Sequence, residues 1–180
     1  MSTVEEQLID ASKSGGVGEV KALLRDNPGL NINWGDWRQF TALHWAANNG
    51  HAEVVKLLLA HPDISVNVTD SDGSTPFLLA CQEGQVSVVR MLLEDPRVDI
   101  TFADENNCTP LWWAAAHAYH EVIEWLIASG RDLGDLDKEG IDGLTTLGAA
   151  RWSERSEVAL LERFLANPAQ TRRELSEAGC

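Results

Sequence analysis

The sequence repeats itself at a fixed interval of 34 residues. Threonine stands at Thr41, Thr75 and Thr109, and the positions after each threonine carry the same kinds of side chain in the same order. In the first copy the apolar members of this pattern are Leu43, Ala46, Val54, Val55 and Leu58. A period of this length is typical of stacked units that cannot bury their apolar side chains alone. Neighbouring copies must therefore supply a shared core.

Each copy contains the start and stop signals of two helices. The threonine is an N-cap residue, and in two copies Pro76 or Pro110 follows it, at the first helical position where proline is favoured. Gly50 and Gly84 are placed to end this first helix. A second helix is predicted over 52–59 and at the equivalent positions of the next copy, and the end of each copy alternates and closes on turn-forming residues.

A helix, a turn, a second helix and a projecting hairpin-like loop together resemble the ankyrin repeat. The segments that carry the resemblance are TALHWAANNGHAEVVKLLL, STPFLLACQEGQVSVVRMLL and CTPLWWAAAHAYHEVIEWLI. The resemblance covers nearly the whole chain. It implies an all-α solenoid of stacked helix-turn-helix units with projecting β-hairpin-like loops, and a role in binding proteins.

The register divides the single expected domain into five units. Residues 1–40 form an N-terminal capping unit, 41–74, 75–108 and 109–144 are full repeats, and 145–180 form a C-terminal capping unit and tail. End caps are expected because the outermost faces of a solenoid meet water. The connection before Thr145 is longer than the earlier ones, so we expect it to be less regular than they are.

The charge of the chain restricts its partners. Fourteen basic residues against 28 acidic residues give a net charge of −14, which repels phosphate backbones and anionic lipids. We expect no nucleic-acid partner and no membrane partner, and a protein partner with a basic segment is favoured. No apolar run approaches the length of a membrane span and no export signal is recognisable, so we expect an intracellular, cytoplasmic monomer, with the nucleus left open.

No catalytic pattern emerges from the sequence. His117 and His120 are close enough to share a metal ion, but no third ligand is placed by local spacing, so neither a metal site nor a cofactor is expected. Cys81 reads as a small core residue, whereas Cys108 and Cys180 would be reactive if exposed. We therefore predict a protein that is not an enzyme.

The resemblance implies that a partner lies along the concave face made by the loop tips and the first helices. His44 occupies the position of the histidine in the family's T-P-L-H pattern. The resemblance implies that it ties the hairpin to the helix by hydrogen bonds. Asp70, Asp72, Glu83, Asp104 and Glu105 are expected to form an acidic central surface that steers a basic segment. The predicted partner-binding residues are Trp37, Arg38, Phe40, Asn48, Asp72, Gln82, Glu83, Glu105, Asn106, Trp112, His117 and Trp152.

For the aromatic residues, the question is whether each side chain is packed in the protein or exposed to a partner. By register, Trp45, Trp113 and Trp125 are expected in the core, and Trp34, which lies on a hairpin strand, is expected to pack onto the neighbouring repeat. Trp37 and Phe40 are either packed or offered to a partner as apolar anchors. Trp112, and with it Trp152, is left as a further candidate anchor.

Two other possibilities stay open at this point. The chain could be a scaffold or regulatory part of a larger protein. The resemblance also makes Asn33 and Asn67 candidates for hydroxylation.

Overall fold

The computed structural model describes residues 2–153 and 155–179. Over these residues the chain forms eleven α-helices and one short 3-10 turn, and no β-strand. The all-α solenoid predicted from the sequence is confirmed. The tails of the units are loops. An isolated antiparallel β-bridge pairs Gly35 with Thr41 within the described residues.

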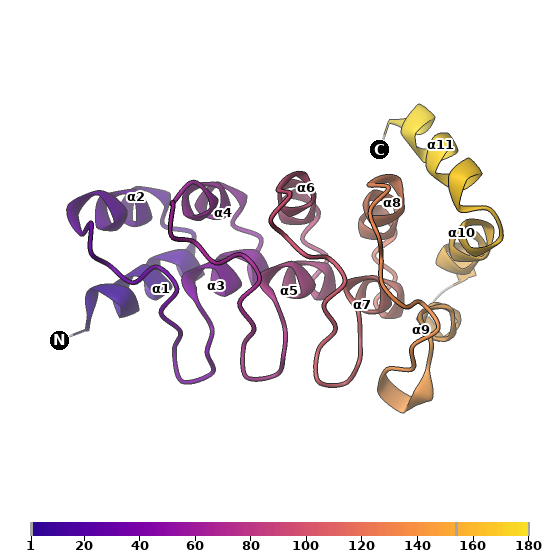
Figure 1. Cartoon of the computed structure of the whole chain (residues 1–180), viewed down its shortest axis with the longest axis horizontal. Helices are drawn as coiled ribbons and strands as arrows, with labels where there is room; N and C mark the ends of the chain where they lie inside the picture. The colour runs from indigo at the N-terminus through magenta and orange to yellow at the C-terminus, as the bar shows by residue number, and fades with distance from the viewer. Residues whose placement is uncertain (1, 154, 180) are drawn as a thin grey trace.

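The helices stack in two rows (Figure 1). An inner row lies next to the projecting loops, an outer row lies behind it, and the last helix folds back over the C-terminal end. The inner helices are α1 (Val4–Ser14), α3 (Ala42–Asn48), α5 (Pro76–Gln82), α7 (Pro110–Ala116) and α9 (Thr146–Ser153). The outer helices are α2 (Val17–Asp26), α4 (Ala52–Leu59), α6 (Val86–Glu94), α8 (His120–Ala128) and α10 (Arg155–Ala166), followed by α11 (Pro168–Ala178).

The repeated threonines start the inner helices. The Oγ1 of Thr41, Thr75 and Thr109 accepts a hydrogen bond from the backbone N–H three residues later, at 3.4, 3.2 and 3.1 Å. Each hydroxyl satisfies a donor that has no partner within the helix. Thr3 does the same for α1 in a capping box with Glu6, so the first unit begins with the same chemistry.

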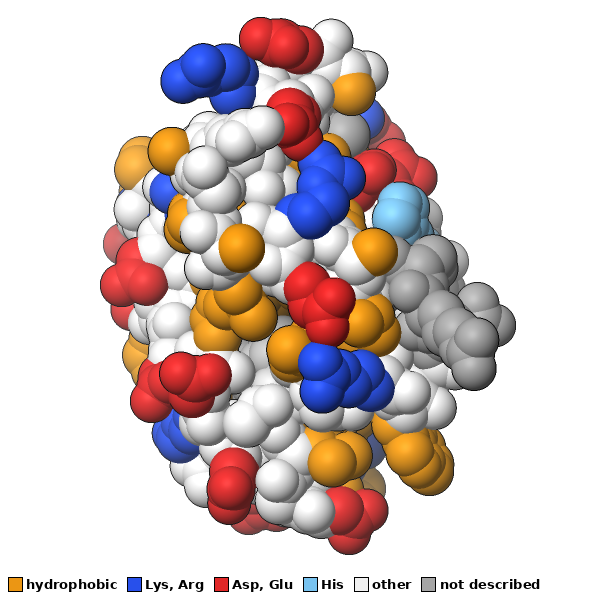
Figure 2. Space-filling model, turned by 90° about the vertical axis from the view of Figure 1, so that its right-hand side faces the viewer, with side chains coloured by type: hydrophobic (Ala, Val, Ile, Leu, Met, Phe, Trp, Pro, Cys, Tyr) orange, Lys and Arg blue, Asp and Glu red, His pale blue; other side chains and the backbone are white. Residues whose placement is uncertain are grey.

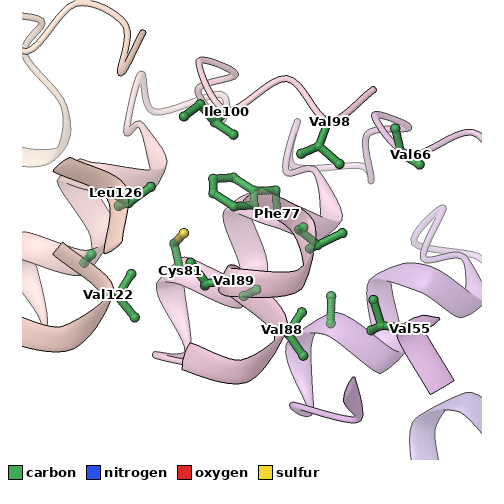
Figure 3. Packing of buried hydrophobic residues seen from close by; sticks show 14 of the residues in the cluster. Val55, Val66, Phe77, Cys81, Val88, Val89, Val98, Ile100, Val122 and Leu126 are labelled. Carbon is green, nitrogen blue, oxygen red and sulfur yellow. The ribbon is translucent and has the colours of Figure 1, made fainter. Parts of the chain in front are cut away.

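One hydrophobic core runs through the whole stack. It begins at Leu8 in α1 and ends at Leu175 in α11, and every unit between them contributes buried side chains. Figure 3 shows Phe77 and Cys81 of α5 among valines of the neighbouring outer helices. Because each apolar stripe is covered partly by the next unit, burial stabilises the array and not the isolated unit.

Four loops project from the inner row, and we name them fingers 1 to 4. In each finger the N–H of the first residue donates to the C=O of the fifth, at 3.0–3.1 Å. Fingers 1 to 4 are residues 36–40, 70–74, 104–108 and 140–144. Finger 4 differs as expected, because it contains the 3-10 turn η1 (Ile141–Gly143) with Asp142 at a φ of 57°.

His44 joins α3 to finger 2. Its Nδ1 accepts from the N–H of Thr41 at 3.1 Å, which leaves the proton on Nε2, and Nε2 lies 3.1 Å from the C=O of Ser74. The expected tie between a loop and a helix is confirmed. Trp112 joins α7 to finger 4 in the same way, because its Nε1 donates a hydrogen bond to the C=O of Leu144 at 2.8 Å.

Arginine side chains tie the outer row together. Arg97 and Arg131 donate to the C=O groups of Leu59 and Leu93, near the ends of α4 and α6. In α11, Arg172 donates to the equivalent C=O of Ile127 at 3.3 Å. A cation is favourable at the negative end of each helix dipole. The predicted polar tail is thus a helix that continues the arginine pattern.

The C-terminal end is covered by mixed side chains. Figure 2 looks onto this end and shows apolar side chains interrupted by acidic and basic ones. Arg163 of α10 pairs with Glu174 of α11, and Leu175 is buried beneath α11. The outer surface of α10 and α11 is therefore charged, whereas the side that faces α8 is apolar.

A glycine is required where α5 turns into α6. Gly84 has a φ of 66°, and a Cβ at this position would lie 2.8 Å from the ring of Tyr119. The third copy has Ala118 in this place, with a φ of 57°. Left-handed backbone costs an L-residue with a Cβ roughly 1–2 kcal/mol, so Ala118 holds a strained conformation.

Two substitutions at this turn should act in opposite directions. Ala118→Gly should raise the free energy of unfolding by about 1 kcal/mol, because it removes the left-handed penalty. Gly84→Ala should lower it by roughly 1–3 kcal/mol, because it adds that penalty and a close contact with Tyr119. Urea unfolding followed by circular dichroism measures both. If Ala118→Gly destabilised the protein, the strain assigned to this position would be refuted.

The second prediction concerns acid stability. Burial lowers the pKa of His44 to about 4, against an ordinary value of 6.5. The unfolded chain takes up a proton below about pH 6.5 while folded His44 stays neutral, so the free energy of unfolding falls as pH drops from 6.5 to about 4. This loss should reach roughly 2–3 kcal/mol at pH 4.5.

His44→Leu, which copies the side chain of the next unit at Leu78, is the matched variant. It should be less stable than the wild type at pH 7, because the C=O of Ser74 loses its donor. Its stability should fall less steeply between pH 6.5 and 4.5. Urea unfolding at several pH values tests this, and equal slopes for the two proteins would rule out His44 as the source.

Candidate partner-binding surface

Three aspartates shape the fingers. Asp36, Asp70 and Asp104 open fingers 1 to 3, and the Oδ1 of each accepts hydrogen bonds from the backbone N–H groups two and four residues later, at 2.8–3.1 Å. Each carboxylate therefore replaces backbone partners that a tight loop cannot supply. The fingers are held at fixed positions along one side of the stack.

This role corrects part of the predicted acidic surface. Asp70 and Asp104 are buried, at 5% and 9% exposure, because their oxygens face the finger backbone. Burial raises the pKa of Asp70, although the N–H groups of Ser74 and Asp72 act in the opposite direction. Asp72, Glu83 and Glu105 are exposed, so they supply the charge that a partner can meet.

The second oxygens of two of these aspartates hold tryptophans at the surface. Trp45 Nε1 donates to Asp36 Oδ2 at 3.2 Å, and Trp113 Nε1 donates to Asp104 Oδ2 at 2.8 Å. The prediction that both indoles belong to the core is wrong. They are half-buried because their register position faces the fingers, where an indole N–H finds an acceptor and one ring surface stays accessible.

A hollow lies between the fingers and the inner helices. We call it the central hollow, and its volume is about 460 Å³. It is bounded by fingers 1 to 3 and by α3, α5 and α7. Eight of the twelve predicted partner-binding residues line it: Arg38, Phe40, Asn48, Asp72, Gln82, Glu83, Glu105 and Asn106.

The central hollow is acidic. Asp72, Glu83 and Glu105 line it with the two turn aspartates, and Arg38 is the one basic side chain among its described lining residues. Arg38 pairs with Asp72 at 3.4 Å, and both side chains are partly exposed. Such a pair contributes little to stability because solvent screens it. The excess of carboxylates favours a cationic partner.

Phe40 and Trp112 are not available as anchors. Phe40 is 4% exposed and packs against the rings of His44 and Trp45, with centroids 5.4 and 4.9 Å away. Trp112 is also 4% exposed and packs with Cys108 beside finger 4. The structure therefore shows both side chains packed within the protein, and neither is exposed to a partner.

Trp37 and Trp152 are the exposed tryptophans. They are 89% and 84% exposed, at finger 1 and in α9. They lie at opposite ends of the inner row, and neither lines the central hollow. Exposed tryptophan is common among residues that carry interface energy.

The remaining predicted aromatic positions are only partly packed. Trp34 is half-buried and lines a separate groove near α1. His117 is exposed, and its ring stacks on Trp113 at 5.5 Å. Trp125 was expected in the core, but it is half-buried on α8 with the guanidinium of Arg90 over its ring at 4.3 Å.

The two described cysteines are buried. Cys108 is fully buried and burial raises its pKa to about 11, so it is not the reactive thiol considered from its place near a loop tip. Burial also raises the pKa of Cys81. Cys180 lies outside the described residues. Within residues 2–153 and 155–179, no group of three His, Cys, Asp or Glu side chains is arranged to hold a metal ion.

Lys13 was missed as a surface residue. Aligning the glycine turns places Lys13 of α1 in register with Asn48 and Gln82, which both line the central hollow. Extending the alignment of the repeats to the first unit would have placed Lys13 on this surface from the sequence. Its Nζ lies 4.3 Å from the centroid of the Trp45 ring.

The comparison with protein families decides the classification. A model described as ankyrin repeats in three copies matches residues 6–70 and 64–137. The chain belongs to the ankyrin repeat family. A search of curated proteins found no match. Ankyrin repeats are in general non-catalytic protein–protein interaction modules.

The described helices were also compared with the length and hydropathy of membrane spans. None of those in residues 2–153 and 155–179 is both long and apolar enough to cross a bilayer.

The contrast between Phe40 and Trp37 gives a stability prediction for this ankyrin domain. Phe40→Ala should lower the free energy of unfolding by about 3–5 kcal/mol, because it empties a packed site between α3 and finger 1. Trp37→Ala should change it by less than about 0.5 kcal/mol. Urea unfolding of both variants checks this. A large loss in Trp37→Ala would mean that its ring packs in solution.

Proposed function

We propose that this ankyrin domain is a non-catalytic binding module whose central hollow receives a basic segment of a protein partner. The main support for this proposal is the position of Asp72, Glu83 and Glu105. All three are exposed in one concave hollow that has a single arginine among its described lining residues. Turn hydrogen bonds hold the fingers before any partner arrives. Little ordering is then required on binding, which favours affinity.

The proposal extends to the ends of the stack. Residues 1–40 and 145–180 act as caps, and the domain acts as a monomer. The mixed charged surface of α10 and α11 supports this, because a further copy stacked there would have to desolvate the exposed pair of Arg163 and Glu174.

Photo-crosslinking tests the binding surface. Benzoylphenylalanine replaces Glu83 in the central hollow or, as the control, Ser87, which is exposed on α6 of the same unit. The position-83 protein should crosslink to a partner in a lysate of the native host, and the position-87 protein should not. This partner should be recovered less at about 1 M salt, where charge attraction is screened.

The opposite pattern would contradict the proposal. If position 87 captured the partner and position 83 did not, the binding surface would lie on the outer helices. If the partner segment crosslinked at position 83 were acidic, the assignment of a basic ligand would fail.

A further inference from the structure

A second hollow adjoins the central one at the N-terminal end of the stack. We call it the N-terminal groove. It lies between α1 and finger 1, and its volume is about 630 Å³. Its lining combines three tryptophans with acidic side chains and a lysine: Trp34, Trp37, Trp45, Glu6, Asp10 and Lys13.

The tryptophans of this groove already meet cations of the protein itself. Lys13 places its ammonium 4.3 Å from the centroid of Trp45, and the guanidinium of Arg38 lies 5.9 Å from that of Trp37. A cation within about 6 Å of an indole centroid is attracted by the negative face of the ring. Two indole rings of the groove therefore already lie against cationic side chains.

The groove and the central hollow are neighbours. Arg38 and Trp45 line both, so one extended segment of a partner is long enough to reach both. Lys13 also occupies the register of Asn48 and Gln82, which places it on the same track along the inner helices. It is exposed at the end of α1, where its flexible stem can move away from Trp45.

We propose that the N-terminal groove binds an arginine side chain of the partner's basic segment. The arginine takes the place of Lys13 over Trp45 and contacts the exposed ring of Trp37. Arginine fits because its planar guanidinium stacks on aromatic faces and is more weakly hydrated than ammonium. Glu6 and Asp10 on α1 supply negative charge beside the rings. This assignment rests on the proposed function and names the residue type at one end of the segment.

Binding of a defined peptide tests the proposal. The probe is a fluorescein-labelled peptide in which eight arginines alternate with glycine, and the control peptide carries citrulline, a neutral isostere, in place of arginine. Fluorescence anisotropy at about 50 mM salt should show binding of the arginine peptide to the full chain and at least tenfold weaker binding of the citrulline peptide. Equal binding of both would overturn the proposal.

Two pairs of variants locate the site. Trp37→Ala should weaken binding about three- to tenfold, whereas Trp152→Ala, which removes an equally exposed indole outside the groove, should leave it within about twofold. Lys13→Gln should strengthen binding about threefold because it frees the face of Trp45. Lys56→Gln, the same charge change on the outer helix α4, should alter it less than twofold because salt screens distant charges.

Failure of this inference is distinguishable from failure of the proposed function. Neutralising the central hollow with Asp72→Asn, Glu83→Gln and Glu105→Gln should weaken the arginine peptide at least tenfold. If it does so while Trp37→Ala and Lys13→Gln bind as the wild type does, the groove assignment is wrong and the central hollow stands. If none of these variants changes binding, the peptide contacts neither hollow and the groove assignment also fails.

Discussion

The structure depends on burial between neighbouring units. Residues such as Val54, Leu58 and Leu92 are fully buried in the stack and belong to one core that several helix pairs share. The free energy gained by removing these side chains from water is shared across every junction. The first and last described helices repeat the polar contacts of the inner units, because Thr3 and Glu6 cap α1 and Arg172 of α11 donates to the C=O of Ile127.

Hydrogen bonds from polar side chains fix the positions of the fingers relative to the inner helices. Apolar burial is not directional, so it does not by itself set the angle of a finger. His44 and Trp112 hydrogen-bond to fingers 2 and 4, and Asp36, Asp70 and Asp104 close the finger turns. Because all of these residues except Asp36 are buried, breaking one of their bonds would leave a partner unsatisfied at considerable cost. The concave surface is therefore shaped before a ligand arrives, and its charge is carried by residues that the turns do not use.

Whether an aromatic side chain is packed or exposed depends on what it faces in the stack. Phe40 and Trp37 stand in the same short loop, yet one is packed against Trp45 and the other is almost fully exposed. Trp45 shares a register with the buried Leu79, but its indole N–H bonds to Asp36 and its ring faces the groove. No periodicity separates these cases, because each is decided by a neighbour from another unit.

The sequence by itself determined the architecture. A fixed period, threonine caps and glycine turns act over a few residues, so the helices, their order and the all-α fold could be predicted locally, whereas the role of His44 came from the resemblance to the ankyrin repeat. Eight of the predicted binding residues also meet in one hollow, because the register puts them on one side. Tertiary structure alone decided that Phe40, Trp112, Asp70 and Asp104 turn inward, and that Lys13 lies over Trp45. These outcomes depend on contacts between units, where space and hydrogen-bond partners come from residues distant in the chain.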